Sequence, residues 1–300
     1  MKRKRRSAYN RESIVCLAIA GFMTFACLFP IWIAFCASIS QERDLVMNGY
    51  PIWIPENPTS GAYQYLIYVQ GKAILRSLKV TISTTVLGTI ISLCVTICYG
   101  YAVAQKEEDF ELARVFAFLA WFSTMFSGGI LPWYILCTRY YGMVNNIWAL
   151  ILPATMTTFH MFLIRNNFKA VPAELYESAE LDGASQAQRM FYIAIPLAKV
   201  GIVTVAMFTA LRYWNDFHLS LYLGTQREYY TLQKLLYQML TNLSQMFQET
   251  ANIPMAEQVA VAPNTARMAF TLLTVMPVLI VYPFAQKYLV QGVTTGAVKG

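Results

Sequence analysis

Few side chains of this 300-residue chain have the types and spacing that catalysis or metal binding requires. Its two histidines, His160 and His218, stand far apart, and no group of His, Cys, Asp and Glu has the spacing of a metal site. The sequence contains no Gly-x-x-x-x-Gly-Lys-[Ser/Thr] loop, the motif that cradles nucleotide phosphates. We therefore expect no catalytic residue, no metal and no cofactor in this chain.

One set of polar side chains interrupts an otherwise apolar segment: Arg212, Trp214, Asn215 and Asp216. Charged residues inside a membrane-spanning segment are costly and tend to face a water-filled cavity or one another. Two interpretations remain open. In the first, Arg212 and Asp216, four residues apart, neutralise each other beside an interfacial Trp214. In the second, the four side chains line a substrate path.

The elements that must position these residues are membrane helices. The chain is 57% hydrophobic and 13% charged, whereas soluble chains carry about 25% charged residues. A helix needs about 20 apolar residues to span a bilayer. Six windows of that kind predict an all-α integral membrane protein with six transmembrane helices, at residues 13–38, 74–104, 114–137, 146–164, 199–221 and 263–285.

Basic residues predict the orientation of these helices. The cluster from Lys2 to Arg6 is compatible with a signal peptide or a nucleic-acid patch, but the apolar run that follows exceeds the roughly 7 to 15 residues of a signal peptide. We expect an uncleaved first helix and no nucleic-acid partner. Because cytoplasmic segments are rich in Lys and Arg, both termini are predicted to be cytoplasmic in a multi-pass protein of the cell membrane.

This layout predicts outer loops at residues 41–73 and 222–262 and an inner loop at residues 166–198. We expect three parts: residues 1–72, with the basic leader, first transmembrane helix and first outer loop; residues 73–287, a core with five transmembrane helices; and residues 288–300, a cytoplasmic tail.

The inner loop has the pattern of two short helices. Pro172 and Gly183 are suited to the start and the end of the first helix. Ser185 and Gln188 predict a capping box for a second helix over residues 186–194. The loop is therefore either a helix-turn-helix elbow on the cytoplasmic face or a linker lying on the surface.

The order of residues in this loop distinguishes these alternatives. It contains Glu177-Ser178-Ala179, three residues, Gly183, nine residues, and Ile-Ala-Ile-Pro ending at Pro196. This order resembles the EAA loop of ATP-binding cassette importer permeases, with Ser178 and Ile195 where the family has Ala and Leu. Residues 213–216, 231–233 and 282–300 are similar to carbohydrate-type permeases, including the second permease of maltose importers and permeases of polysaccharide or oligosaccharide uptake.

The resemblance implies a membrane-spanning permease subunit that translocates a sugar or oligosaccharide. An extracellular solute-binding protein would deliver the substrate to a pair formed with a second, homologous permease. Two ATPase subunits would bind ATP and Mg, and lipid would surround the helices. The elbow would dock on an ATPase subunit through six residues: Leu175, Glu177, Ser178, Ala179, Asp182 and Gly183.

Three other segments have candidate functions, and for the last two the resemblance implies them. Arg212, Trp214, Asn215 and Asp216 are candidates for the substrate path, where Trp214 would stack on a sugar ring. The loop 222–262 is a candidate for contact with the binding protein, and the C-terminal tail for contact with the ATPase pair.

Two other classes of protein remain alternatives. An ion-coupled secondary transporter usually has internal inverted repeats, and no convincing repeat is apparent in the sequence. A membrane-embedded enzyme needs a positioned acid or base, whereas the outer loops hold only scattered carboxylates.

Overall fold

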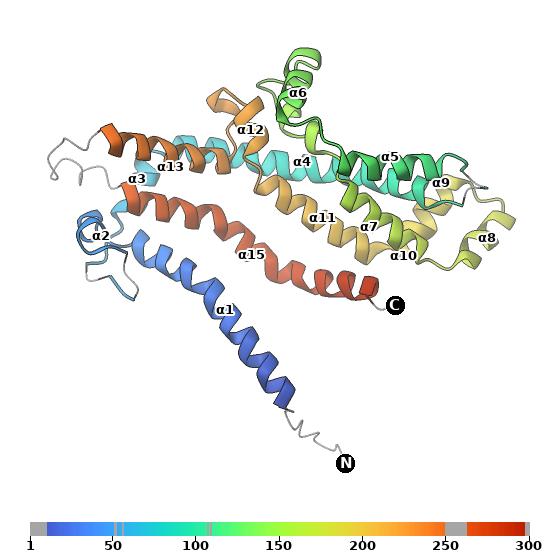
Figure 1. The fold of residues 1–300 in the computed structure, drawn as a ribbon, viewed down its shortest axis with the longest axis horizontal. Coiled ribbons are helices and arrows are strands. Elements are labelled where there is room, and N and C mark those ends of the chain that lie inside the picture. The colour runs from blue at the N-terminus through green and yellow to red at the C-terminus, as the bar shows by residue number, and fades with distance from the viewer. Residues whose placement is uncertain are drawn as a thin grey trace. The chain divides into compact units, whose positions relative to one another are not determined.

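The computed structural model describes residues 11–50, 53–55, 57–106, 108, 110–249 and 263–297. Over these residues the chain is helical, and its one β contact is an isolated bridge between Ser40 and Pro58 (Figure 1). The chain divides into two compact units. The first comprises Met1–Gly71 and Met239–Val275, and the second comprises Lys72–Gln238 and Met276–Gly300.

The first unit contains helix α1 (Arg11–Ser38), α2 (Glu42–Asn48), α3 (Gly61–Tyr68) and the first part of α15 (Pro263–Ala297). Along α1 the large apolar side chains are exposed, as Leu17 and Phe22 illustrate. A surface of this kind is suited to lipid. Glu42, at the start of α2, is 6% exposed and accepts hydrogen bonds from the backbone N–H groups of Asn264 (3.0 Å) and Thr265 (2.9 Å). Glu42 therefore caps the N-terminus of α15, where a negative charge is stabilising.

The main helices of the second unit are α4 (Gly71–Ala104), α5 (Ala113–Met125), α7 (Thr158–Lys169) and α11 (Lys199–Trp214). Small and hydroxylated side chains form the buried face of α4, which allows neighbouring helices to approach closely. A Cβ atom at Gly88 would lie 2.6 Å from the ring of Tyr213. The Tyr213 hydroxyl lies 3.1 Å from that of Ser92 and donates to the carbonyl of Ile151 at 2.9 Å. Tyr213 thus connects α11 to α4 and to the segment before α7.

Shorter elements join or extend these helices. They are α6 (Ile130–Ile135), the π-helix η1 (Leu136–Tyr140), the 3-10 helices η2 (Trp148–Leu150), η3 (Leu152–Ala154) and η5 (Arg227–Tyr229), α8 (Ala173–Leu181), α9 (Gln186–Arg189), the π-helix η4 (Met190–Ala194), α10 (Ile195–Leu197), α12 (His218–Leu223) and α13 (Leu232–Glu249).

The described helices match the predicted windows unevenly. Ser13–Ser38 and Gly71–Ala104 are single helices long and apolar enough to cross a membrane, as predicted. Two bent pairs bring the number of candidate spans among the described residues to four if each pair counts once. In the third window, α5 and the α6–η1 segment meet at 115° because Gly129, with φ at +82°, breaks the helix.

The last three windows differ more from the expected continuous helices. The window 146–164 is wrong as one helix: it contains two 3-10 turns and only the first part of α7. Pro153 lacks the N–H that an α-helix would use there. In the fifth window, α11 ends at Trp214, before the predicted end at residue 221, and the next helix is α12. Helix α15 begins at residue 263 as predicted but extends beyond residue 285.

Candidate functional site

Helices α8 and α9 form a helix-turn-helix elbow, defined here as residues 173–189. Helix α8 ends at Leu181, and Gly183 follows with φ at +79°, a conformation that glycine adopts without strain. The N–H of Ala184 donates to the carbonyl of Ala179, and that of Gly183 to the carbonyl of Glu180, both at 2.9 Å. This is a Schellman turn. The helix end predicted at Gly183 is therefore confirmed.

The start of α9 is also as predicted. The Ser185 hydroxyl accepts from the N–H of Gln188 at 3.3 Å, and the Gln188 side chain accepts from the N–H of Ser185 at 2.8 Å. These two bonds make the expected capping box. Helix α9 continues through the π-helix η4 into α10, and the Gln186–Leu197 segment meets Lys199–Trp214 at 81°. The elbow is thus continuous with the start of α11 through one sharp bend.

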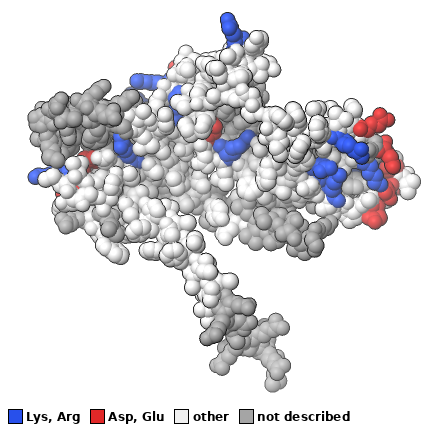
Figure 2. Space-filling model, viewed as in Figure 1, with Lys and Arg blue, Asp and Glu red and all other residues white. Residues whose placement is uncertain are grey.

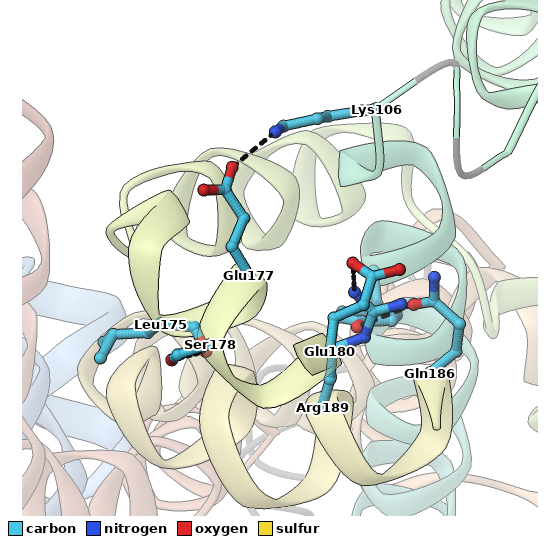
Figure 3. A network of polar contacts seen from close by, with 8 residues as sticks. Lys106, Leu175, Glu177, Ser178, Glu180, Gln186 and Arg189 are labelled. Carbon is cyan, nitrogen blue, oxygen red and sulfur yellow. Dashed lines mark hydrogen bonds and ion pairs between the residues drawn. The ribbon is translucent and has the colours of Figure 1, made fainter. Parts of the chain in front are cut away.

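Part-buried polar contacts join the two arms of the elbow to each other and to α4. Arg189 Nη1 donates to Glu180 Oε2 at 2.7 Å, with the Arg189 side chain 8% exposed. The hydroxyl of Tyr101, near the end of α4, donates to Gln186 Oε1 at 3.2 Å. Figure 3 shows Arg189 and Glu180 joining the two arms of the elbow beside Gln186. The arms and the end of α4 are therefore linked by side chains as well as by the turn.

Glu177 makes a different kind of contact. Lys106 Nζ, just beyond α4, lies 3.0 Å from Glu177 Oε1, and the two side chains are 60% and 58% exposed. In Figure 3 Glu177 points toward Lys106, whereas Leu175 and Ser178 lie on another side of α8. An exposed pair of this kind contributes about 0–1 kcal/mol to stability. Glu177 is therefore available to exchange Lys106 for another partner.

The six residues predicted to dock on an ATPase subunit lie together on this elbow. Leu175, Glu177, Ser178, Asp182 and Gly183 are exposed, and Ala179 is half-buried. The space-filling view shows acidic and basic side chains gathered at the end of the second unit where α8 lies (Figure 2). Leu181, which sequence reasoning missed, is 89% exposed. Its sequence signal is an apolar residue directly before the Asp-Gly turn.

A cavity of ≈290 Å³ lies behind α8, between the elbow and the ends of α4 and α7. Aromatic side chains form part of its wall: Tyr101, Phe168 and Tyr176. Burial, and secondly the neighbouring Tyr101, raises the pKa of Tyr176 to about 12, so its hydroxyl stays neutral. Gln105 and five charged side chains also line the cavity: Lys106, Lys169, Arg189, Glu177 and Glu180.

The structure separates the four candidates for the substrate path. Arg212 Nη1 donates to Thr157 Oγ1 at 2.7 Å and Nη2 donates to the carbonyl of Ala154. Asp216 Oδ2 accepts from the N–H of Leu219 at 3.1 Å and so satisfies a backbone donor in the first turn of α12. Arg212 and Asp216 thus make separate hydrogen bonds, while their opposite charges still attract each other. Their interpretation as a mutually neutralising pair stays a prediction.

Trp214 and Asn215 have different surroundings. Trp214 lines a second, apolar cavity of ≈150 Å³ within the second unit. The other lining residues come from three helices: Thr85 from α4, Met207, Ala210 and Leu211 from α11, and Pro277, Val278 and Tyr282 from α15. Asn215 is exposed, and its Nδ2 donates to the carbonyl of Leu211 at 2.9 Å. Of the four candidates, Trp214 lines this cavity.

Comparison with known proteins gives a consistent result. Residues 16–295 match the family model described as binding-protein-dependent transport system inner membrane component. The chain is 35% identical to Protein LplC of Bacillus subtilis over 275 residues, which cover 91% of this chain and 90% of that protein.

Two further similar proteins have names that state what they transport. The polygalacturonan/rhamnogalacturonan transport system permease protein YtcP of Bacillus subtilis is 30% identical over 95% of this chain and 98% of that protein. A crystal structure of a bacterial ABC transporter involved in the import of the acidic polysaccharide alginate contains a similar chain. It matches with a TM-score of 0.79 and 27% identity, over 93% of this chain and 98% of that one.

Proposed function

The chain belongs to the family of binding-protein-dependent transport system inner membrane components, and on that premise we propose that it forms half of a sugar-translocation path. It is an all-α permease subunit of an ATP-binding cassette importer rather than an ion-coupled secondary transporter. Its cargo in this proposal is a sugar or oligosaccharide, which the names of its relatives support.

The proposed assembly contains this chain, a second homologous permease, two ATPase subunits and an extracellular solute-binding protein. ATP and Mg are bound by the ATPase subunits and not by this chain. Both termini are cytoplasmic, six segments cross the membrane, and residues 166–198 lie on the cytoplasmic side. The two segments around the bend at Gly129 count as one span in this arrangement.

One observation carries the proposed mechanism: the elbow presents an exposed surface and is held internally by part-buried polar contacts. Glu177 and Leu175 are exposed on α8, while Arg189 and Gln186 tie the elbow to itself and to α4. A partner that moves α8 therefore moves α9 and the start of α11 with it. Glu177 is suited to a charge-assisted hydrogen bond with a basic surface of the ATPase subunit.

Two variants test this docking surface in the assembled complex. Glu177→Arg reverses the docking charge, and Gly183→Pro removes the positive φ that the turn requires. We expect both to reduce substrate-stimulated ATP hydrolysis and sugar uptake at least about tenfold, the loss expected for a charge-assisted bond of roughly 1.5–3 kcal/mol. Glu174→Arg, at another exposed carboxylate of α8, is the matched control. Unchanged hydrolysis in both variants would contradict the docking role.

Trp214 is the proposed contact between the translocation path and the sugar. Its ring borders an apolar cavity, and aromatic faces are suited to the apolar faces of sugar rings. We expect Trp214→Ala to lower sugar uptake while the complex still assembles. Trp121→Ala, at an exposed tryptophan of α5 outside the cavity, serves as the control. Equal uptake in the two variants would remove Trp214 from the path.

A further inference from the structure

The cavity behind α8 collects positive charge from three separate elements. Lys106 follows α4, Lys169 ends α7 and Arg189 ends α9, and all three line the cavity. Two carboxylates also line it, but Glu180 is engaged by Arg189 and Glu177 by Lys106. Burial lowers the pKa of Lys169, and the charge of the neighbouring Arg165 lowers it further. The wall near Lys169 is therefore electropositive.

Arg189 provides a second, independent observation. Its side chain is 8% exposed, yet its Nε atom is buried without a hydrogen-bond partner, while Nη1 is bonded to Glu180. A buried charged donor without an acceptor carries a desolvation cost of about 1–3 kcal/mol or more. The same residue lines the cavity. The guanidinium charge at the cavity wall is therefore only partly satisfied by Glu180, and an anion bound in the cavity would stabilise it electrostatically.

We propose that this cavity binds a phosphate group, held by Arg189 and Lys169 with Lys106 at its edge. Phosphate oxygens accept several charge-assisted hydrogen bonds at once, which matches a guanidinium and two ammonium groups from different directions. The cavity, at ≈290 Å³, leaves room for more than the phosphate group, and its wall includes Tyr101, Phe168 and Tyr176. The ligand class is therefore a phosphate monoester, either a free metabolite or the headgroup of a lipid.

Occupation of the cavity has a consequence for the elbow. Lys106 borders the cavity and also pairs with Glu177, so a bound phosphate competes with Glu177 for Lys106. Phosphate binding would release Glu177 and so favour its contact with the ATPase subunit. This regulatory step rests on the docking role proposed above, whereas the binding site itself does not.

Binding is tested first, on the purified complex in detergent. Titration with inorganic phosphate and with glycerol 3-phosphate, followed by calorimetry, is expected to show saturable binding. Lys169→Gln, a change at an exposed side chain, should weaken it at least about tenfold. Lys199→Gln, at an exposed lysine that does not line the cavity, should leave it unchanged. The proposed site is wrong if none of the probes, phosphatidic acid included, shows saturable binding. It is also wrong if Lys169→Gln and Lys199→Gln bind phosphate with equal affinity.

A second arm distinguishes the source of the phosphate. Nanodiscs of phosphatidylcholine with or without phosphatidic acid replace the detergent. If phosphatidic acid stabilises the complex, if Lys169→Gln abolishes this stabilisation and if glycerol 3-phosphate does not compete, the ligand is a lipid headgroup. If glycerol 3-phosphate competes with phosphatidic acid, the ligand is soluble. Either result supports the site, and stabilisation that persists in Lys169→Gln contradicts it.

The regulatory step has its own readout. Glycerol phosphate should raise substrate-stimulated ATP hydrolysis in the wild type and in Lys199→Gln but not in Lys169→Gln. If the ligand binds and hydrolysis does not respond, the regulatory step is wrong. If Glu177→Arg also leaves hydrolysis unchanged, the docking role fails while the binding site stands.

Discussion

At the elbow, Lys106 and Glu177 pair in solvent, with side chains 60% and 58% exposed. At the junction of α12 and α13, by contrast, Lys234 is 3% exposed. Its Nζ donates to the carbonyls of Ser220 (2.8 Å) and Gly224 (2.6 Å) and lies 3.9 Å from the ring centroid of Tyr230. The first lysine can exchange its partner at little cost, and the second cannot.

This difference relates charge placement to motion. A buried charge that satisfies helix-end carbonyls holds two elements in one arrangement, because its removal leaves those carbonyls unpaired. An exposed pair adds little stability and leaves its members free to bind a partner protein. We infer that the α12–α13 junction is rigid, whereas the elbow is the surface on which contacts change during transport.

The largest expected effect is at Lys234. Lys234→Met keeps the apolar stem but leaves the carbonyls of Ser220 and Gly224 without their donor. We expect a loss of about 2–4 kcal/mol in the free energy of unfolding, measured by denaturant or thermal unfolding in detergent. Lys72→Met, at an exposed lysine, should change stability by less than about 0.5 kcal/mol. Equal effects of the two changes would show that burial of Lys234 does not stabilise the junction.

Glu42 offers a second buried charge at a helix end. Glu42→Gln replaces one acceptor oxygen by an amide donor facing the N–H groups of Asn264 and Thr265. We expect a loss of about 1–2 kcal/mol, the usual range for a lost N-terminal cap. Asp44→Asn, on the same helix but bonded to Asn57 near the surface, should have a smaller effect. A larger effect at Asp44 would contradict the capping role of Glu42.

The two regions also differ in how far the sequence predicts them. The elbow was predictable because its determinants are local: Gly183 stands at a helix end, and the Ser185–Gln188 box spans three residues. The contacts of Lys234 and Glu42 were not predictable, because a lysine or glutamate in a predicted loop gives no signal of the distant backbone groups that it binds. Hydropathy windows likewise find apolar length but not the bend at Gly129.

The pH dependence of stability gives a smaller effect at the buried lysine. Burial lowers the pKa of Lys234 to about 8, whereas an unfolded lysine has a pKa of about 10.4. Between these values the unfolded state binds more protons than the folded state, so stability rises with pH, by at most about 1.4 kcal/mol per pH unit. We expect the stability difference between the wild type and Lys234→Met to grow from pH 8 to pH 10. A constant difference would show that Lys234 titrates normally.

The smallest effect is expected at the exposed pair. A double-mutant cycle with Lys106→Gln and Glu177→Gln should give a coupling energy below about 1 kcal/mol in unfolding measurements. The single variants should fold normally, because both side chains are more than half exposed. A coupling energy of several kcal/mol would make Glu177 a structural residue, and the loss of ATP hydrolysis expected in Glu177→Arg would then reflect a damaged elbow. A small coupling energy combined with a large loss of hydrolysis separates docking from stability, because an exposed charge that does not hold the fold together can affect hydrolysis only through the partner that it binds.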